Sequence, residues 1–322
     1  MSAIQAQGLR KAFGPFVALD GLSLTVEPGA VFGFLGPNGA GKTTTIRILA
    51  GLARADAGQV SVAGVDLRTD GHLLSRRVGY LPEEPAFYPW MSAVEFLDYV
   101  GRLYGQTPAE RKTRTAELLE LTGLTEARKR RVGGYSRGMR QRLGLAQALY
   151  HRPEVLLLDE PVSALDPAGR KDVLGLIEGL RGTNSALRGT DSALRGTCTV
   201  FMSTHILADV ERICDSVAVI DHGRLLAQGR RDELIERYAT PALRVEAAAG
   251  AAEAFAAWAA GLNALPWVSA VTVDGLTATV QVTDLPLAQR ELLRLAVAAD
   301  LTLERYELVK PTLEDVFLRI VA

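Results

Sequence analysis

Short, continuously apolar runs alternate with helix-like patterns along residues 1–238 of the chain. A helix-like pattern over 43–50 follows the first of these runs and stops at Gly51, a residue type that often ends helices. The runs that indicate buried strands lie at 30–35, 154–158, 199–203 and 216–220. Strands that alternate with helices are typical of a mostly parallel sheet covered on both faces, so the pattern predicts an α/β fold.

The middle of this region has a different pattern. Residues 91–104 and 108–121 carry apolar side chains at helical spacing, and we expect a helical insert over about residues 85–150. Residues 180–197 read LRGTNSA LRGTDSA LRGT, a repeat whose Gly, Thr and Ser content does not suit a coiled coil. We interpret this repeat as an expanded surface loop, because lengthening a loop costs little free energy.

After Tyr238 the composition becomes rich in alanine, which indicates a separate C-terminal domain over residues 239–322. The dipeptide Asp274-Gly275 joins two alternating runs and is a strong signal for a hairpin. We predict strands at 243–247, 268–273, 277–282 and 302–308, and helices at 251–262, 287–298 and 312–320. The order β-α-β-β-α-β-α suggests a small ferredoxin-like α+β domain with one extra helix.

The composition is that of a globular protein, with 322 residues, a formal net charge of −1 and 48% hydrophobic residues. Near-neutral charge argues against a large basic surface for nucleic acid. We find no apolar run that suits a signal peptide, and none approaches the roughly 20 residues of a membrane-spanning helix. Cys198 and Cys214 have apolar neighbours, so we expect buried thiols in a reducing cytosol.

The strongest chemical motif follows the first predicted strand and reads GPNGAGKT, a phosphate-binding loop of the form G-x-x-x-x-G-K-[ST]. Its glycines let backbone N–H groups turn toward phosphate oxygens, and the next helix adds its positive N-terminal end. We expect Lys42 to reach the terminal phosphates and Thr43 to bind Mg²⁺. An ordinary Gly-rich turn before a helix is the alternative. The predicted phosphate-binding residues are Gly36, Pro37, Asn38, Gly39, Ala40, Gly41, Lys42, Thr43 and Thr44.

A second motif, VLLLDE, places Asp159 and Glu160 where a buried strand ends, at the edge where α/β sheets bind ligands. We expect Asp159 to hold Mg²⁺, mostly through water, and Glu160 to act as the general base toward an attacking water. Taken alone, a strand that ends in two acids is equally well explained by capping of the next helix. Its position downstream of a phosphate-binding loop favours the catalytic interpretation.

Over residues 1–238 the chain resembles the ATP-binding subunits of ABC transporters. After the helical insert, the segment YSRGMRQR stands where this family has its signature, commonly Leu-Ser-Gly-Gly-Gln, so Tyr135, Arg137 and Met139 depart from the common form. The resemblance implies ATP as the nucleotide, Mg²⁺ as the cofactor, and a second subunit whose signature closes over the γ-phosphate. The residues expected to act on the partner's ATP are Ser136, Arg137, Gly138, Met139 and Asp166.

Three further positions match the same family. Ser163-Ala-Leu-Asp166 stands at the loop that spans the dimer interface, and His205 stands at the histidine that contacts the γ-phosphate. The spacing from Asp159 to His205 is longer than is usual in the family, and the LRGT repeat accounts for the excess. Phe13 stands where the family places an aromatic ring against adenine, although burial in the core is the alternative for this side chain.

One departure is Glu83 in the segment GYLPEEP, where the family usually has a glutamine. A glutamate can bind Mg²⁺ through oxygen as a glutamine does, but it adds negative charge near the γ-phosphate. Some exporter-type members have Pro-Glu-Glu here, so we interpret Glu83 as a mark of a subfamily. The following cluster, Phe87 to Met91, stands where the family docks a coupling helix of a membrane permease, with burial inside the insert as the alternative.

The last segment, PTLEDVFL, resembles the C-terminal domain of exporter-type ATPases that pair with separate permeases. The resemblance implies an ATPase, expected as a homodimer, that is peripheral on the cytoplasmic face of the membrane and drives export. One alternative is a soluble relative that acts on ribosomes or nucleic acid, but we find no second ATPase domain and only one basic run, at 128–131. The other is a regulatory ATP-binding subunit, which Glu83 leaves open.

Overall fold

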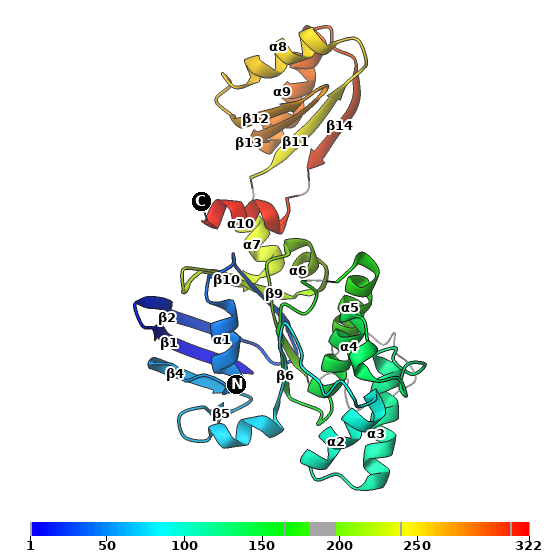
Figure 1. Ribbon diagram of the computed structural model, residues 1–322. Helices are drawn as coiled ribbons and strands as arrows, with labels where there is room; N and C mark the ends of the chain where they lie inside the picture. The colour runs from blue at the N-terminus through cyan, green and yellow to red at the C-terminus, as the bar shows by residue number, and fades with distance from the viewer. Residues whose placement is uncertain (1, 164, 181–197, 239, 310, 322) are drawn as a thin grey trace. The chain divides into compact units, whose positions relative to one another are not determined.

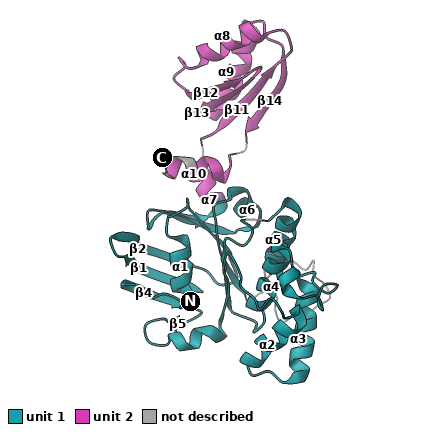
Figure 2. Cartoon of the chain, in the orientation of Figure 1, with its two compact units in different colours: residues 1–231, 321 teal, residues 232–320, 322 magenta. Residues whose placement is uncertain are grey.

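The computed structural model describes residues 2–163, 165–180, 198–238, 240–309 and 311–321. The chain divides into two compact units, residues 1–231 and 232–320 (Figure 2). The division lies a few residues before the expected boundary at Tyr238, so nearly all of helix α7 (Arg231–Tyr238) belongs to the second unit. Apart from Leu180, the predicted loop over the LRGT repeat lies outside the described residues.

The main sheet of the first unit positions the candidate site. Among the described residues its strand order is β10-β9-β3-β8-β7-β6, and only β10 pairs antiparallel with its neighbour. The mostly parallel sheet predicted from the sequence is therefore confirmed. The strands are β3 (Val31–Leu35), β6 (Val78–Leu81), β7 (Val155–Asp159), β8 (Thr199–Thr204), β9 (Ser216–Asp221) and β10 (Arg224–Arg230).

A second, antiparallel sheet has the order β2-β1-β4-β5 within the described chain and was not predicted. Its strands are β1 (Ile4–Phe13), β2 (Phe16–Val26), β4 (Ala57–Val62) and β5 (Val65–Asp66). One face of each strand carries the buried apolar residues, which join those of β3, β7 and β9 in one core. Helix α1 (Lys42–Leu49) lies between the two sheets (Figure 1), and its Ile46, Ile48 and Leu49 side chains pack in the shared core.

The predicted helical insert is present as α2 (Ala93–Leu103), α3 (Pro108–Leu121) and α4 (Arg137–Ala148). Helix α2 begins two residues inside the predicted range because Ser92 caps it, in a reciprocal pairing with the backbone and side chain of Glu95. The remaining short helical elements of this unit are η1 (Gly71–Arg76), η2 (Val132–Gly134), α5 (Pro167–Gly179) and α6 (Leu207–Ile213).

The second unit has the predicted ferredoxin-like order of elements. In its described part the sheet order is β12-β13-β11-β14, with every pair antiparallel, as the β-α-β-β-α-β pattern requires. Helices α8 and α9 supply the apolar residues that pack on one face of this sheet. The elements are β11 (Ala242–Ala247), α8 (Ala252–Leu262), β12 (Val268–Asp274), β13 (Thr277–Val282), α9 (Leu285–Ala298), β14 (Leu303–Val309) and the extra helix α10 (Leu313–Val321).

Both cysteines are buried thiols, as the apolar surroundings indicated. Burial raises the pKa of the Cys198 thiol to about 12, because the thiolate would lose its hydration. The core beside it is aromatic: the Phe201 ring on β8 stacks on Phe32 with 5.4 Å between centroids and lies 5.2 Å from Phe34. These rings belong to β3 and β8, the two middle strands of the parallel sheet, and pack in its core.

We expect Phe201→Ala to lower the free energy of unfolding by about 3–5 kcal/mol, because it removes a fully buried ring and leaves a cavity. Urea unfolding of the full chain, followed by circular dichroism, measures the change. Leu52→Ala is the matched control, since Leu52 is 64% exposed and its truncation should change stability by no more than about 0.5 kcal/mol. Equal losses for the two variants would contradict this account of the core.

Candidate functional site

The phosphate-binding loop lies between the buried strand β3 and helix α1, and neighbouring backbone fixes its shape. A Cβ atom on Gly36 would lie 2.4 Å from the carbonyl oxygen of Ile220. Gly41 has a φ of +106°, and a Cβ there would lie 2.6 Å from the carbonyl oxygen of Ala18. Side chains at either position would displace backbone, so only glycine allows this close approach. The resulting cradle fits a group whose oxygens accept hydrogen bonds from backbone N–H groups.

Lys42, the first residue of α1, is buried and holds its charge inside the loop. Its Nζ atom donates hydrogen bonds to the carbonyl oxygens of Gly36 at 2.8 Å and Pro37 at 3.2 Å. The same Nζ lies 3.3 Å from Oε1 of Glu160. A buried ammonium is stable only with such partners, and an incoming phosphate can replace them with stronger ones.

Asp159 ends β7 and is almost fully buried. Its Oδ1 accepts hydrogen bonds from the hydroxyls of Ser203 at 2.8 Å and Thr43 at 3.3 Å. Burial raises the pKa of the Asp159 carboxyl, while these two hydrogen bonds act in the opposite direction. The carboxylate and the Thr43 hydroxyl are the hard oxygen donors that Mg²⁺ prefers.

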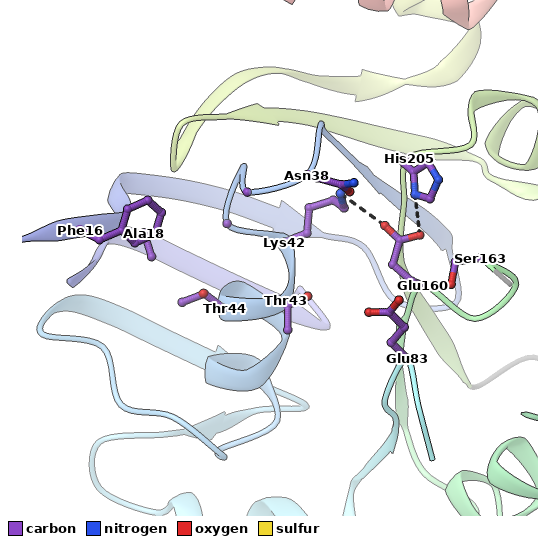
Figure 3. Close-up of a pocket in the computed structure, with 12 residues that line it drawn as sticks. Phe16, Ala18, Asn38, Lys42, Thr43, Thr44, Glu83, Glu160, Ser163 and His205 are labelled. Carbon is purple, nitrogen blue, oxygen red and sulfur yellow. Dashed lines mark hydrogen bonds and ion pairs between the residues drawn. The ribbon is translucent and has the colours of Figure 1, made fainter. Parts of the chain in front are cut away.

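Glu160 follows at once and stands in an unusual backbone conformation, with a φ of +46°. Its carboxylate lies between two groups: Oε1 is near Lys42, and Oε2 is 3.0 Å from Nδ1 of His205 (Figure 3). Its backbone N–H donates to the Ser203 hydroxyl at 3.0 Å. The two ends of the carboxylate and the backbone are all held, so this side chain is fixed at the mouth of the loop.

These groups face an open cavity of about 390 Å³. It is lined by Phe16, Ala18, Asn38, Gly39, Gly41, Lys42, Thr43, Thr44, Glu83, Glu160, Ser163 and His205 (Figure 3). Most of the predicted binding residues are therefore brought together. Asp159 lies just beneath, bonded to Thr43. Gly36, Pro37 and Ala40 belong to the loop itself and do not line the cavity.

The aromatic residue at this cavity differs from the predicted one. Phe16 lines the cavity and Phe13 does not, although the two residues pair across the hairpin of β1 and β2. Phe13 is 55% exposed, so the alternative of a core phenylalanine is wrong, and the Lys11 ammonium lies 5.3 Å from its ring centroid. The sequence offered no reason to prefer Phe16, since its place follows from the register of the hairpin.

The signature residues lie away from this cavity. Ser136 is the N-cap of α4, and its hydroxyl accepts a hydrogen bond from the Met139 N–H at 3.2 Å. Arg137 lies 3.3 Å from Glu84, and both side chains are largely exposed. Gly138 follows in the first turn of α4, and Asp166 is the N-cap of α5. None of the five residues expected to act on a partner's ATP lines the cavity of its own chain, among the residues described.

Ser203 is a further polar residue that the sequence did not assign to the site. The sequence signal that could have found it is its position near the end of β8 (Thr199–Thr204), two residues ahead of His205. Within the described chain, no group of three or more His, Cys, Asp or Glu side chains is arranged to hold a metal by itself. A magnesium ion here would need phosphate and water oxygens beside Thr43 and Asp159.

The glycine cradle, the buried lysine and the two consecutive acids at the end of β7 together define a phosphate-loop nucleotide hydrolase. Residues 19–163 match the family described as ABC transporter, and residues 229–321 match the C-terminal domain of DrrA1-3-like ATP-binding proteins. The chain belongs to the family of ABC transporter ATP-binding proteins and is an ATPase subunit, as the sequence predicted.

Full-length relatives support this assignment. YxlF of Bacillus subtilis (strain 168), an uncharacterized ABC transporter ATP-binding protein, is 38% identical over 319 residues, 99% of each chain. The linearmycin resistance ATP-binding protein LnrL of the same organism is 34% identical over 322 residues, 98% of this chain and 97% of the relative. The daunorubicin resistance ATP-binding protein DrrA3 of Streptomyces coeruleorubidus is 36% identical over 319 residues, 99% of this chain and 96% of the relative.

Solved structures agree with the fold. An ATP-binding subunit of an ABC transporter superposes with a TM-score of 0.63 at 27% identity, over 74% of this chain and 93% of that chain. The ADP conformation of the ATP-binding cassette MJ1267 gives a TM-score of 0.61 at 25% identity, over 74% of this chain and 94% of that chain. The fold of the ABC cassette is thereby confirmed for this protein.

We expect Phe16→Ala to weaken ATP binding by about tenfold, because the ring is available for stacking on the adenine. Phe13→Ala is the matched control on the facing strand and should leave the affinity nearly unchanged. Equilibrium titration with a fluorescent ATP analogue measures both dissociation constants. A loss confined to Phe13→Ala would show instead that the original assignment of the adenine contact to Phe13 holds.

Proposed function

We propose that this ATPase works as a dimer with two shared sites, uses Mg²⁺, and drives a separate membrane permease for export. The observation that carries the proposal is the arrangement of Lys42, Glu160 and His205 around one cavity, with ion-pair distances of 3.3 and 3.0 Å. We assign this cavity to the β- and γ-phosphates, with Lys42 as the phosphate-binding cation and Glu160 as the base.

The chemistry assigned to these residues is hydrolysis of the γ-phosphate. Lys42 exchanges the Glu160 carboxylate and loop carbonyl oxygens for phosphate oxygens, which leaves Glu160 open to a water molecule. Glu160 accepts a proton from this water as the water oxygen bonds to the γ-phosphorus. The bond from phosphorus to the β–γ bridging oxygen breaks, and that oxygen leaves on ADP with the electron pair. His205 keeps the Glu160 carboxylate oriented through its Nδ1 contact.

Mg²⁺ when bound supplies charge neutralisation between the β- and γ-phosphates. The Thr43 hydroxyl and Asp159 carboxylate are the groups we assign to it, because they are oxygen donors already joined by a 3.3 Å hydrogen bond. Glu83 lines the same cavity and adds a further carboxylate there. We assign it a secondary role as a metal or water ligand in the place of the usual glutamine.

The proposal of a dimer rests on the signature residues, which do not line the cavity of their own chain. That cavity contains no residue from the signature segment among those described, although Ser136 and Gly138 sit at the exposed start of a helix. Such a helix start offers N–H groups and a positive dipole end to an anion. We therefore assign Ser136, Arg137, Gly138 and Met139 to the ATP held by a second copy, with Asp166 at the same interface.

We assign permease docking to an aromatic surface formed by Tyr88, Trp90 and Tyr99. Trp90 is 63% exposed and Tyr88 41% exposed, and their rings lie 5.2 Å apart, while Tyr99 of α2 lies 5.9 Å from Tyr88. The Phe87 ring packs instead on Phe96 and anchors the segment. Exposed aromatic clusters of this kind are the usual anchors of protein interfaces. The burial alternative thus fits Phe87, and the docking interpretation fits Tyr88 and Trp90.

Export and location rest on the relatives. LnrL and DrrA3 are named for resistance to linearmycin and daunorubicin, and both align over almost the whole of this chain, including the C-terminal domain. Removal of a toxic compound from the cell is one way in which a transporter gives resistance. None of the described helices has the length and apolar character needed to cross a bilayer. We therefore propose a peripheral position on the cytoplasmic face, held by the permease.

We expect the Glu160→Gln protein to be a monomer without nucleotide and a dimer with Mg-ATP, because ATP binds at both shared sites and is not cleaved. Size-exclusion chromatography with light scattering measures the mass in each state. The rate of steady-state hydrolysis should fall by a factor of about 100 or more. A Glu160→Gln protein that hydrolyses ATP at the original rate would overturn the assignment of the base.

The matched control for this experiment is the double variant Glu83→Gln with Glu160→Gln. If Glu83 weakens the site through its negative charge, the double variant should form the dimer at a lower ATP concentration than Glu160→Gln alone. If neither variant dimerises with Mg-ATP, the proposal that ATP alone joins two copies is wrong. Both arms use the full chain.

We expect Trp90→Ala to lower the fraction of the protein that sediments with membranes by about tenfold, since truncated interface tryptophans often cost 2 kcal/mol or more of binding energy. The ATPase rate of the purified protein should not change, because Trp90 lies outside the nucleotide cavity. Leu52→Ala is the control, with an equally exposed apolar side chain elsewhere in the same unit. Unchanged sedimentation of Trp90→Ala would contradict docking at this surface.

A further inference from the structure

We propose that Ser203 is a positioning residue for ATP hydrolysis, because its hydroxyl holds the Asp159 carboxylate and the Glu160 backbone at the same time. The proposal rests on the roles assigned above to these two acids. Ser203 would thus join the metal-binding side of the site to the side that carries the base, and it would act through both.

The register of the parallel sheet creates this contact. Ser203 on β8 is the direct neighbour of Asp159 on β7, and its side chain is fully buried. The hydroxyl donates to Oδ1 of Asp159 at 2.8 Å and accepts from the Glu160 N–H at 3.0 Å. One small side chain therefore uses its donor and an acceptor on two consecutive residues, which fixes the orientation of its hydroxyl.

Glu160 needs this acceptor because of its backbone. A φ of +46° is uncommon for a residue with a side chain, and it persists only where surrounding contacts hold it. This conformation turns the chain as β7 ends. The Glu160 N–H therefore donates to the Ser203 hydroxyl and not to the backbone of a neighbouring strand. Without the hydroxyl, a buried N–H would lose its partner, and the turn that aims the Glu160 carboxylate would lose a restraint.

Asp159 accepts the hydrogen bond that the Ser203 hydroxyl donates. Its Oδ1 accepts from the Ser203 hydroxyl as well as from Thr43, so both hydroxyls that reach the carboxylate bind the same oxygen. This sets the rotation of the carboxylate relative to α1, where the Thr43 hydroxyl lies. Loss of Ser203 would leave the weaker 3.3 Å contact to Thr43 as the restraint from these two groups.

A purely structural role is the alternative, and Thr199 offers a matched comparison. It lies at the other end of β8, is almost fully buried, and its hydroxyl also accepts a backbone N–H, that of Gly29 at 2.9 Å. Thr199→Ala thus removes a similar buried acceptor from the same strand without touching either acid. A role in general strand stability predicts similar losses at both positions, while a role in positioning predicts a loss at Ser203 alone.

The test compares Ser203→Ala, Ser203→Thr and Thr199→Ala in the full chain. Turnover and KM are measured with Mg-ATP, and binding of a non-hydrolysable ATP analogue is measured with and without Mg²⁺. Every turnover value is divided by the fraction of protein that binds the analogue, so unfolded material does not contribute. We expect Ser203→Ala to lower kcat by about ten- to a hundredfold, with KM changed by less than about threefold.

We further expect Mg²⁺ to increase the affinity for the analogue less in Ser203→Ala than in the original protein. Ser203→Thr should restore both kcat and this Mg²⁺ effect, and Thr199→Ala should behave as the original protein. Unchanged kcat and Mg²⁺ gain in Ser203→Ala would overturn the proposal, as would an equal loss in Thr199→Ala. A failure of the proposed function would be distinct, because the original protein itself would then show no Mg²⁺-dependent hydrolysis.

Discussion

The close approach of backbone around the phosphate-binding loop is the constraint on which the rest of the site depends. Gly36 lies against the carbonyl of Ile220 in β9, and Gly41 against the carbonyl of Ala18 in β2. The loop is therefore held between β9 of the parallel sheet and β2 of the antiparallel sheet. Because α1 begins directly after it, the position of Lys42 is set by packing on both sides, before any ligand contact.

The charges at this point follow from the same packing. Lys42, Asp159 and Glu160 are all buried, and the unfavourable loss of hydration is offset by pairing and hydrogen bonds within the cluster. In this cluster the charges of Lys42 and Glu160 stabilise each other at 3.3 Å while no phosphate is bound. The Lys42–Glu160 ion pair thus holds both side chains in place. Because this pair must be exchanged for contacts with ATP, the site does not have the geometry needed for hydrolysis before ATP binds.

The sequence predicted the parts of the site that lie in contiguous residues. The phosphate loop and the acids that end β7 each carry their chemistry within a few positions, so spacing and apolar pattern were sufficient. The ferredoxin-like order was predictable for the same reason, from alternation and one Asp-Gly turn. Phe16 and Ser203 were not predicted, because their positions at the site depend on strand register: Phe16 on pairing across a hairpin, Ser203 on its parallel neighbour in β7.

The departures in the signature segment have a physical account in the packing of α4. Tyr135 replaces the common leucine and stays buried, while its hydroxyl donates to the carbonyl of Ala127, so the larger ring adds no unpaired polar group. Arg137 replaces a glycine but points to Glu84 at the surface, where an exposed ion pair is worth about 1 kcal/mol at most. With both changes present, Ser136 still caps α4, and its hydroxyl accepts the Met139 N–H at 3.2 Å. Arg137 pairs with Glu84 of the Pro-Glu-Glu segment, whereas Glu83, the residue at the usual glutamine position, lines the nucleotide cavity.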